Sequence, residues 1–316
     1  MESDNEWDIL KTELPRWIDA AIPFTLQGKV ASYIPELSKA SPNALGIDIV
    51  NTEGERISAG DASQPFTLQS ISKVFTLLLA LMDHGENKVF EKVGMEPTGD
   101  KFDSMLKLEL ELVQPGIPFN PLINAGAIVV SSMVKGSTQE EKSARILQFI
   151  RTLAANPDLN YDMPVYRSEA ESADLNRAIA YILKDYRVIT GNVDEILDIY
   201  FRQCSILVTC TELARMALVL ACNGFDPILK KQLVPKRYVQ IAKTFMITCG
   251  MYDASGEFAI QVGLPAKSGV SGGVLSLLPN RYGIGVLGPS LNAKGNSIAG
   301  VHLLKMISKE RNWSIF

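Results

Sequence analysis

Histidine is scarce in this sequence: only His84 and His302 occur in 316 residues. A Ser-His-Asp triad would need one of these two as its base. Neither has another histidine, a cysteine or a carboxylate at the spacing of metal ligands, so we expect no zinc site. We also expect no cofactor. If the protein is a hydrolase, lysine or tyrosine is the expected base.

Paired cysteines, long apolar runs and basic runs are also missing. The four cysteines form no Cys-x-x-Cys pair, and the acidic start MESDNEWDIL lacks the pattern of a signal peptide, so disulfides are not expected. No apolar run approaches the ~20 residues that span a bilayer. The net charge is −4 without a basic run, so we expect no nucleic-acid partner and no membrane partner. These absences predict a cytoplasmic location.

The most informative segment is FTLQSISKVFTLLLALMDHG, residues Phe66–Gly85. Its residues 71–82 are apolar on nearly every side, which predicts a buried helix, and Gly85 predicts where that helix ends. Ser70 and Lys73 lie three residues apart at its start, so they share a helix face. Burial lowers the pKa of a lysine, and a neutral amine beside a hydroxyl is a general base beside a nucleophile.

The Ser-x-x-Lys motif is weak by itself, since it occurs three times, at residues 70/73, 104/107 and 132/135. The second pair lies among charges, and the third lies at the far end of an apolar run. Only the first pair opens a buried helix, where unpaired backbone N–H groups could hold an oxyanion. The alternative is that Ser70 caps the helix and Lys73 extends its amine to solvent.

A second unusual segment is PAKSGVSGG, residues Pro265–Gly273, among the C-terminal strands. Glycine within a strand often marks the close approach of a ligand or of another backbone. Lys267 could hold a substrate carboxylate, or its charge could keep a neighbouring lysine neutral. The alternative is a bulged strand with one exposed lysine.

Strand-like segments lie near both ends of the chain. ALGIDIV and ERISAGD, joined by the turn Asn51–Gly54, predict a hairpin, and FAIQVGL, VLSLLP and YGIGVLG predict strands after residue 248. The middle of the chain is mainly helical. We therefore expect an α/β (α+β) fold, in which a mixed or antiparallel sheet built from N- and C-terminal segments carries an inserted helical lobe. The predicted boundaries are one domain over 1–316, with an α/β lobe of about 1–66 plus 248–316 and a helical lobe of about 67–247.

Four predictions concern individual helices. Residues 7–22 predict one or two short helices interrupted at Pro15. Residues 173–184 predict a helix preceded by acidic residues that suit its N-terminus. The sequence TCTE at 209–212 predicts a capping box. Residues 296–309 predict a closing helix with one apolar face.

Six segments together resemble the serine-dependent glutaminase family of bacterial type: LQSISK, NPLINAGAI, SEAESADLN, YFRQCSILVTC, CGMYDASGEFA and GLPAKSGVSGG. They follow the family's order, and Ser-x-x-Lys with Lys-Ser-Gly is similar to the β-lactamase and penicillin-binding-protein fold. The resemblance implies hydrolysis of L-glutamine to L-glutamate and ammonia through an acyl-enzyme on Ser70, with Lys73 as the base. It also implies a homodimer or homotetramer.

The resemblance implies the other site residues as well. Tyr252 and Tyr33 would assist catalysis. Glu169 would pair with the α-ammonium of a free amino acid, and backbone N–H groups would form the oxyanion hole. The implied substrate contacts are Ser70, Asn124, Glu169, Asn176, Tyr200, Tyr252 and the backbone of Val270. The segment Leu112–Gly116 departs from the family pattern by being slightly longer.

Two other functions stay open at this point. One is a different amidase, an esterase or a β-lactamase on the same fold; the missing export signal and the placement of Glu169 count against cell-wall chemistry. The other is a non-catalytic sensor that binds an amino acid. The presence of Ser70, Lys73 and Tyr252 together counts against a sensor.

Overall fold

The computed structural model describes residues 2–98 and 116–316. The second Ser-x-x-Lys pair, Ser104 and Lys107, lies outside the described residues. So do residues 112–115 of the segment that the sequence predicts to be longer than in its relatives, so the role of that segment stays a prediction.

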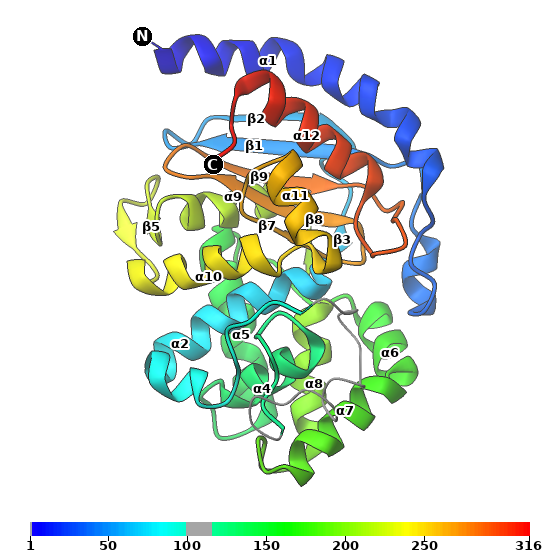
Figure 1. Cartoon of the computed structure of the whole chain (residues 1–316), viewed down its shortest axis with the longest axis vertical. Coiled ribbons are helices and arrows are strands. Elements are labelled where there is room, and N and C mark those ends of the chain that lie inside the picture. Colours follow the sequence, from blue (N-terminus) through cyan, green and yellow to red (C-terminus); the bar gives the residue numbers. More distant parts are fainter. Residues whose placement is uncertain (1, 99–115) are drawn as a thin grey trace.

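A five-stranded antiparallel sheet occupies the upper part of the molecule (Figure 1). Its strands lie in the order β2–β1–β9–β8–β7, and β1 pairs with β9 from Gly46↔Leu287 to Asn51↔Tyr282. One sheet is therefore built from N- and C-terminal segments, as the sequence predicts. The strands are β1 (Gly46–Asn51), β2 (Arg56–Gly60), β7 (Ala266–Ser268), β8 (Gly273–Leu278) and β9 (Tyr282–Leu287).

Helices cover both faces of this sheet. The helices α1 (Glu2–Ala21) and α12 (Ile298–Arg311) lie over one face, and α9 (Cys210–Ala221) packs against the other (Figure 1). The contact with α9 is close because β9 has glycine there: a Cβ on Gly283 would lie 2.1 Å from the carbonyl oxygen of Ala214. The capping box that starts α9 is confirmed by the pairing of Thr209 with Glu212.

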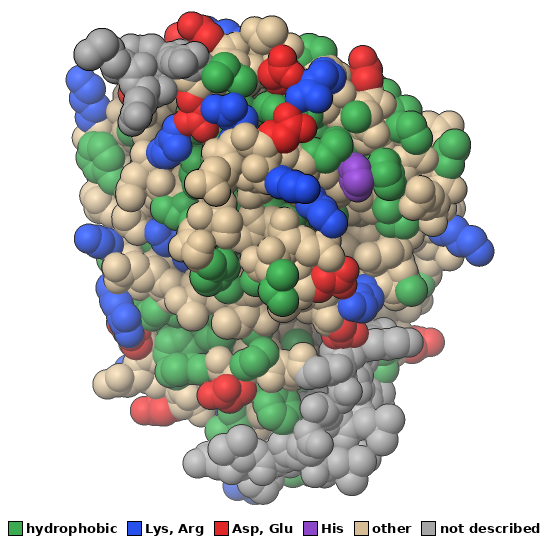
Figure 2. Space-filling model, turned by 45° about the horizontal axis from the view of Figure 1, so that its top comes forward, with side chains coloured by type: hydrophobic (Ala, Val, Ile, Leu, Met, Phe, Trp, Pro, Cys, Tyr) green, Lys and Arg blue, Asp and Glu red, His purple; other side chains and the backbone are tan. Residues whose placement is uncertain are grey.

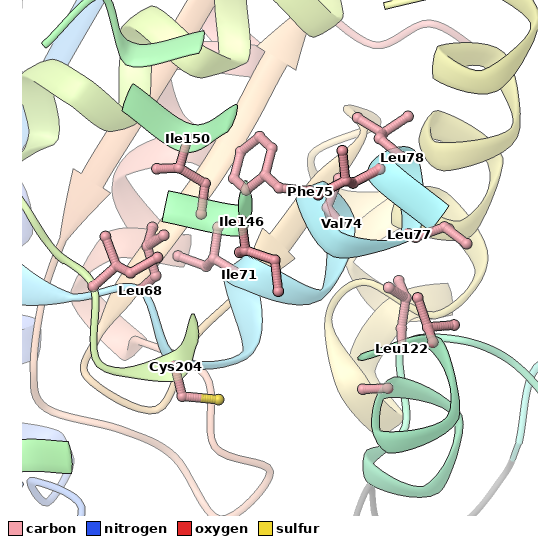
Figure 3. Close-up of a cluster of buried hydrophobic side chains, with 14 of the residues drawn as sticks. Leu68, Ile71, Val74, Phe75, Leu77, Leu78, Leu122, Ile146, Ile150 and Cys204 are labelled. Atoms are coloured by element: carbon pink, nitrogen blue, oxygen red, sulfur yellow. The ribbon is translucent and has the colours of Figure 1, made fainter. Parts of the chain in front are cut away.

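Most of the remaining helices form the lower part of Figure 1, around α2 (Ser72–Phe90), whereas α11 (Ser255–Gln261) lies beside the sheet, where Phe258 joins the apolar cluster of α1 and α12. Figure 3 shows Ile71, Val74 and Phe75 among apolar side chains of α5, which include Ile146 and Ile150. The prediction of a buried helix at this position is therefore correct. The other helices are α4 (Asn124–Met133), α5 (Gln139–Ala154), α6 (Met163–Ser172), α7 (Asp174–Asp185), α8 (Val193–Cys204) and α10 (Lys236–Thr248).

Short elements connect these parts. The strand β3 pairs antiparallel with β4 just before α2 begins, and a 3₁₀ turn, η3, joins β3 to α2. Another 3₁₀ turn, η4, precedes α11. The short elements are η1 (Ile22–Gln27), η2 (Pro35–Lys39), β3 (Phe66–Thr67), η3 (Gln69–Ile71), β4 (Leu207–Val208), β5 (Phe225–Asp226), β6 (Lys231–Gln232) and η4 (Tyr252–Ala254).

Three local predictions need correction. The interruption at Pro15 is wrong, since α1 runs through it; the buried side chains on this helix (Leu10, Leu14 and Trp17) hold it in place despite the lost hydrogen bond. FAIQVGL is not a strand: its first residues belong to α11, where Phe258 is buried and Ile260 is 87% exposed.

The helix predicted over residues 173–184 is confirmed as α7, and the acidic residues before it form a further helix, α6. The third correction concerns the predicted end of the buried helix. At Gly85 the chain leaves helical geometry, with φ 78° and ψ 168°, but it resumes the helix as far as Phe90. The division into two lobes stays a prediction, and α9 from the middle of the chain packs on the sheet.

The surface agrees with the charge pattern of the sequence on the face that Figure 2 shows. Basic and acidic side chains are mixed over this face, where α1 and α12 come forward. Within residues 2–98 and 116–316, no helix combines the length and the apolar character needed to cross a bilayer.

Candidate active site

Ser70 lies in the tight turn η3, between the short strand β3 and the buried helix α2. Leu68 donates its backbone N–H to the carbonyl oxygen of Ile206 at 2.9 Å, which ties this turn to α8 and β4. The next residue, Gln69, has a left-handed backbone with φ 48°. Residues other than glycine rarely adopt this backbone conformation, and those that do cluster at functional sites.

Lys73 follows one turn later and is 1% exposed. Its Nζ donates hydrogen bonds to Asn124 Oδ1 at 2.6 Å and to the carbonyl oxygen of Leu122 at 3.3 Å. The same Nζ lies 5.9 Å from the ring centre of Tyr200. The alternative in which Lys73 extends its amine to solvent is therefore wrong, because the amine ends inside the protein.

The segment between β7 and β8 packs directly against the Ser70 turn. A Cβ on Gly269 would lie 2.7 Å from the carbonyl oxygen of Leu68, so only glycine fits at this contact. Ser271 Oγ donates to the carbonyl oxygen of Thr67 at 2.6 Å. These contacts bring the second unusual segment of the sequence to the first, although about 200 residues separate Thr67 from Ser271.

Tyr252 and Lys267 meet on this segment. Tyr252 donates its hydroxyl to the carbonyl oxygen of Ser268 at 3.1 Å, and its side chain also hydrogen-bonds that of Ser70. Lys267 is 0% exposed, donates to the same carbonyl oxygen at 2.7 Å, and lies 4.3 Å from the ring centre of Tyr252. An exposed Lys267, the alternative left open by the sequence, is excluded.

Burial sets the charge of these groups. Desolvation lowers the pKa of Lys267 well below its ordinary value, and the charge of Lys73 lowers it further. Desolvation likewise raises the pKa of the Tyr252 hydroxyl above its ordinary value, although the hydrogen bond with Ser70 opposes this. Tyr252 is therefore a phenol at neutral pH, able to donate or relay a proton.

A pocket of about 90 Å³ opens beside Ser70. Glu169 of α6 lies in its wall and is 6% exposed. Desolvation raises the pKa of this carboxyl to about 8, while the amide of Gln69 and the charge of Lys73 lower it. The residues that line the pocket are Tyr33, Ile34, Gln69, Ser70, Asn124, Glu169, Ser172, Ala173, Leu175, Asn176, Tyr200 and Cys204.

Amide and phenol groups in the pocket hold one another in place. Asn124 Nδ2 donates to Asn176 Oδ1 at 3.0 Å, and Tyr200 donates its hydroxyl to Asn124 Oδ1 at 3.3 Å. With Lys73, this network joins four helices, α2, α4, α7 and α8. Asn124, Asn176 and Tyr200 line the same pocket as Glu169.

Most of the residues that the family resemblance implies therefore lie around one pocket. Tyr33 lines it while being 56% exposed. Val270 is not among the lining residues; it is buried with Tyr252 in a small apolar cluster, and its backbone follows Gly269 past the Ser70 turn. His84 bonds the carbonyl oxygen of Met133 and His302 stacks on Phe24, so neither meets Ser70.

Sequence reasoning missed Gln69 and Cys204. Cys204 is a buried thiol that also lines the pocket. The sequence held one indication of a role for Gln69, because this residue directly precedes Ser70. Within the described residues, no group of His, Cys, Asp or Glu side chains is arranged to hold a metal ion.

An antiparallel sheet with a buried serine and lysine at the start of the central helix is typical of enzymes with the β-lactamase-like fold. Within that class, residues 28–316 match the sequence model of the family Glutaminase, so the chain belongs to the glutaminase family.

Close relatives agree with this assignment. The chain is 52% identical to a glutaminase of Bacillus cereus over 303 residues, which cover 96% of this chain and 97% of that protein. It is 54% identical to a glutaminase of Alkaliphilus metalliredigens over 289 residues, 92% and 94% of the two chains.

Solved structures are similar over the same length. A probable glutaminase from Bacillus subtilis in complex with 6-diazo-5-oxo-L-norleucine is 39% identical, with a TM-score of 0.89 and 97% of each chain covered. A second Bacillus subtilis structure shows the covalent complex formed by reaction with that compound; it is 38% identical, has a TM-score of 0.89, and covers 97% of this chain and 99% of that one.

Proposed function

We propose that this protein hydrolyses the side-chain amide of L-glutamine to L-glutamate and ammonia through an acyl-enzyme on Ser70. One observation carries the proposal: Ser70 and the buried carboxyl of Glu169 line one pocket, and two buried groups reach that pocket, Lys73 through Asn124 and Tyr252 through Ser70. A free amino acid with an amide at the far end of its side chain suits that arrangement.

In the first step, the neutral amine of Lys73 takes the proton of Ser70 Oγ, and Oγ forms a bond to the amide carbon of glutamine. The negative charge then falls on the former carbonyl oxygen. The backbone N–H groups of Ser70 and Val270 are proposed to donate to this oxygen, each worth about 2.7–4 kcal/mol. The close contact of Gly269 with Leu68 supports this role, because it brings the Val270 backbone beside the turn.

In the second step, the bond from carbon to nitrogen breaks and the leaving nitrogen takes a proton. The proton held by Lys73 reaches it through the hydroxyl of Tyr252, which stays protonated at neutral pH because burial raises its pKa. Ammonia leaves and a glutamyl ester remains on Ser70. A water molecule then attacks the ester in the reverse sense, which releases glutamate and restores the Ser70 hydroxyl.

The two α-groups of the substrate are proposed to bind at different walls. The ionised carboxylate of Glu169 pairs with the α-ammonium. Asn124, Asn176 and Tyr200 donate to the α-carboxylate, with Tyr33 at the pocket mouth. Since both α-groups are required, a glutamine within a peptide is a poor substrate.

The test is ammonia release from L-glutamine by wild type and by Ser70→Ala. We expect the variant to lose activity by a factor of roughly 10³ or more. Ser132→Ala is the matched control, because Ser132 also belongs to a Ser-x-x-Lys pair but donates to the carbonyl oxygen of Val129. If Ser70→Ala kept most of the activity, the proposed mechanism would be wrong.

The alternatives left open by the sequence have their own outcomes in the same assay. Turnover of the β-lactam nitrocefin without turnover of glutamine would assign the protein to β-lactamase chemistry. Binding of glutamine in calorimetry without any ammonia release would assign it to sensing. The homodimer or homotetramer and the cytoplasmic location stay predictions, and light scattering would decide the first.

A further inference from the structure

Gln69 is a buried residue to which the proposed mechanism gives no role. Its backbone is left-handed, with φ 48°, and the contacts on both sides enforce this conformation. Leu68 is tied to Ile206 before it, and after it Ser72 Oγ donates to the carbonyl oxygen of Gln69 at 2.7 Å. A left-handed residue with a Cβ persists where its surroundings over-determine it, and here it immediately precedes the nucleophile.

The side chain of Gln69 reaches Thr67 and Glu169. Its Nε2 donates to Thr67 Oγ1 at 3.3 Å and lies 3.5 Å from Glu169 Oε2. The second contact is long for a hydrogen bond, so it can shorten when Glu169 carries its full charge. Other groups that face this carboxyl are Lys73 from α2 and, from α8, Tyr200 and Cys204.

One residue therefore touches both halves of the proposed reaction. The backbone of Gln69 fixes the turn that holds Ser70. Its side-chain amide touches the carboxyl that would receive the substrate ammonium. Thr67, which anchors the amide, is itself held by Ser271 of the opposing segment. Gln69 therefore links the turn that carries Ser70 to the carboxyl of Glu169.

We propose that Gln69 is a positioning residue: its left-handed backbone directs Ser70 at the substrate amide, and its side-chain amide orients the Glu169 carboxylate for the substrate ammonium. This inference rests on the proposed function. It separates two effects that substitutions can test one at a time, because Asn and Gly both accept the left-handed conformation and only Asn keeps an amide.

The amide is tested with Gln69→Asn, whose amide is one methylene shorter. Glutamine affinity is measured by calorimetry in the Ser70→Ala background, and covalent labelling of Ser70 by 6-diazo-5-oxo-L-norleucine is followed by mass spectrometry. We expect roughly tenfold weaker glutamine binding, because a hydrogen bond to a charged group is lost. The labelling rate at saturating reagent should stay within about threefold of wild type, since the backbone conformation is kept.

The backbone is tested with Gln69→Gly, which relieves the left-handed strain and frees the turn. We expect the same loss of affinity and a saturating labelling rate lower by roughly tenfold or more. The matched control is Lys230→Gly: Lys230 is exposed, has φ 53°, and lies outside the pocket. That variant should gain stability with unchanged binding and labelling.

The outcomes are decisive in either direction. Wild-type affinity in Gln69→Asn would overturn the role of the amide. Wild-type labelling at saturation in Gln69→Gly, or failure of that variant to fold, would overturn the role of the backbone. Both variants are compared with a wild type that releases ammonia and is labelled at Ser70. If the wild type does neither, the proposed function is wrong, and this outcome differs from a failure of the Gln69 proposal alone.

Discussion

The charge of Glu169 predicts how glutamine affinity depends on pH. Burial raises the pKa of its carboxyl to about 8, so in the empty pocket the group is mostly protonated at pH 7. Pairing with the substrate ammonium requires the ionised form. Binding below pH 8 must therefore release a proton, and each unit of pH costs about 1.36 kcal/mol, a factor of about ten in affinity.

The assay is calorimetric titration of Ser70→Ala with L-glutamine between pH 6 and 8.5. We expect the Kd to be about tenfold higher at pH 7 than above pH 8, and about a hundredfold higher at pH 6. The control is Glu169→Gln, which should bind weakly with a Kd that no longer changes with pH. A Kd that stays constant from pH 6 to 8.5, or the same pH dependence in Glu169→Gln, would refute the assignment of the ammonium to Glu169.

The same carboxyl makes a linked prediction for stability. Its pKa is raised from the ordinary value of 4.5 to about 8, so between these values the folded state binds the proton that the unfolded state has lost. Stability therefore falls as pH rises through this window, by up to about 5 kcal/mol for this group. Urea denaturation at pH 5 and pH 8.5 should show this loss in wild type, and Glu169→Gln should lack this group's share of it.

Three further substitutions follow from the same contacts. Tyr252→Phe removes the hydroxyl that bonds Ser70 and the carbonyl oxygen of Ser268; kcat for ammonia release should fall by roughly 10²-fold with little change in KM, and an equal rise in KM would contradict the proton-relay role. Lys267→Met removes a buried amine whose pKa lies well below 10.5. Because the unfolded state binds this proton more tightly, wild type should gain stability relative to the Met variant as pH rises toward 10.5. If urea denaturation gave the same stability difference between the two proteins at every pH, the amine of Lys267 would not be neutral. Leu78→Ala empties a fully buried position of α2, which should lower the free energy of unfolding by about 3 kcal/mol in urea denaturation, whereas a loss under 1 kcal/mol would contradict tight packing.

Local chemistry made the elements near Ser70 predictable. An all-apolar run identifies a buried helix whatever surrounds it, and the hairpin turn at Asn51–Gly54 is confirmed by the pairing of β1 with β2. The errors arose where local patterns compete with packing. Pro15 weakens a helix by itself, but the buried face of α1 outweighs that loss.

The candidate site divides in the same way. Ser70 and Lys73 are neighbours in the chain, so their spacing and apolar context were visible in the sequence. Glu169, Tyr200 and Tyr252 come from separate elements, and only the family resemblance pointed to them before the fold was known.

The sequence by itself determined the class of fold, the exclusion of a histidine-based triad, and the serine–lysine pair at the start of a buried helix. The tertiary structure decided the charge and strain of the groups around that pair. It buried Lys267, raised the pKa of Glu169, and held Gln69 in a left-handed conformation. Desolvation and enforced backbone geometry depend on atoms brought together from distant parts of the chain, so no local pattern can encode them.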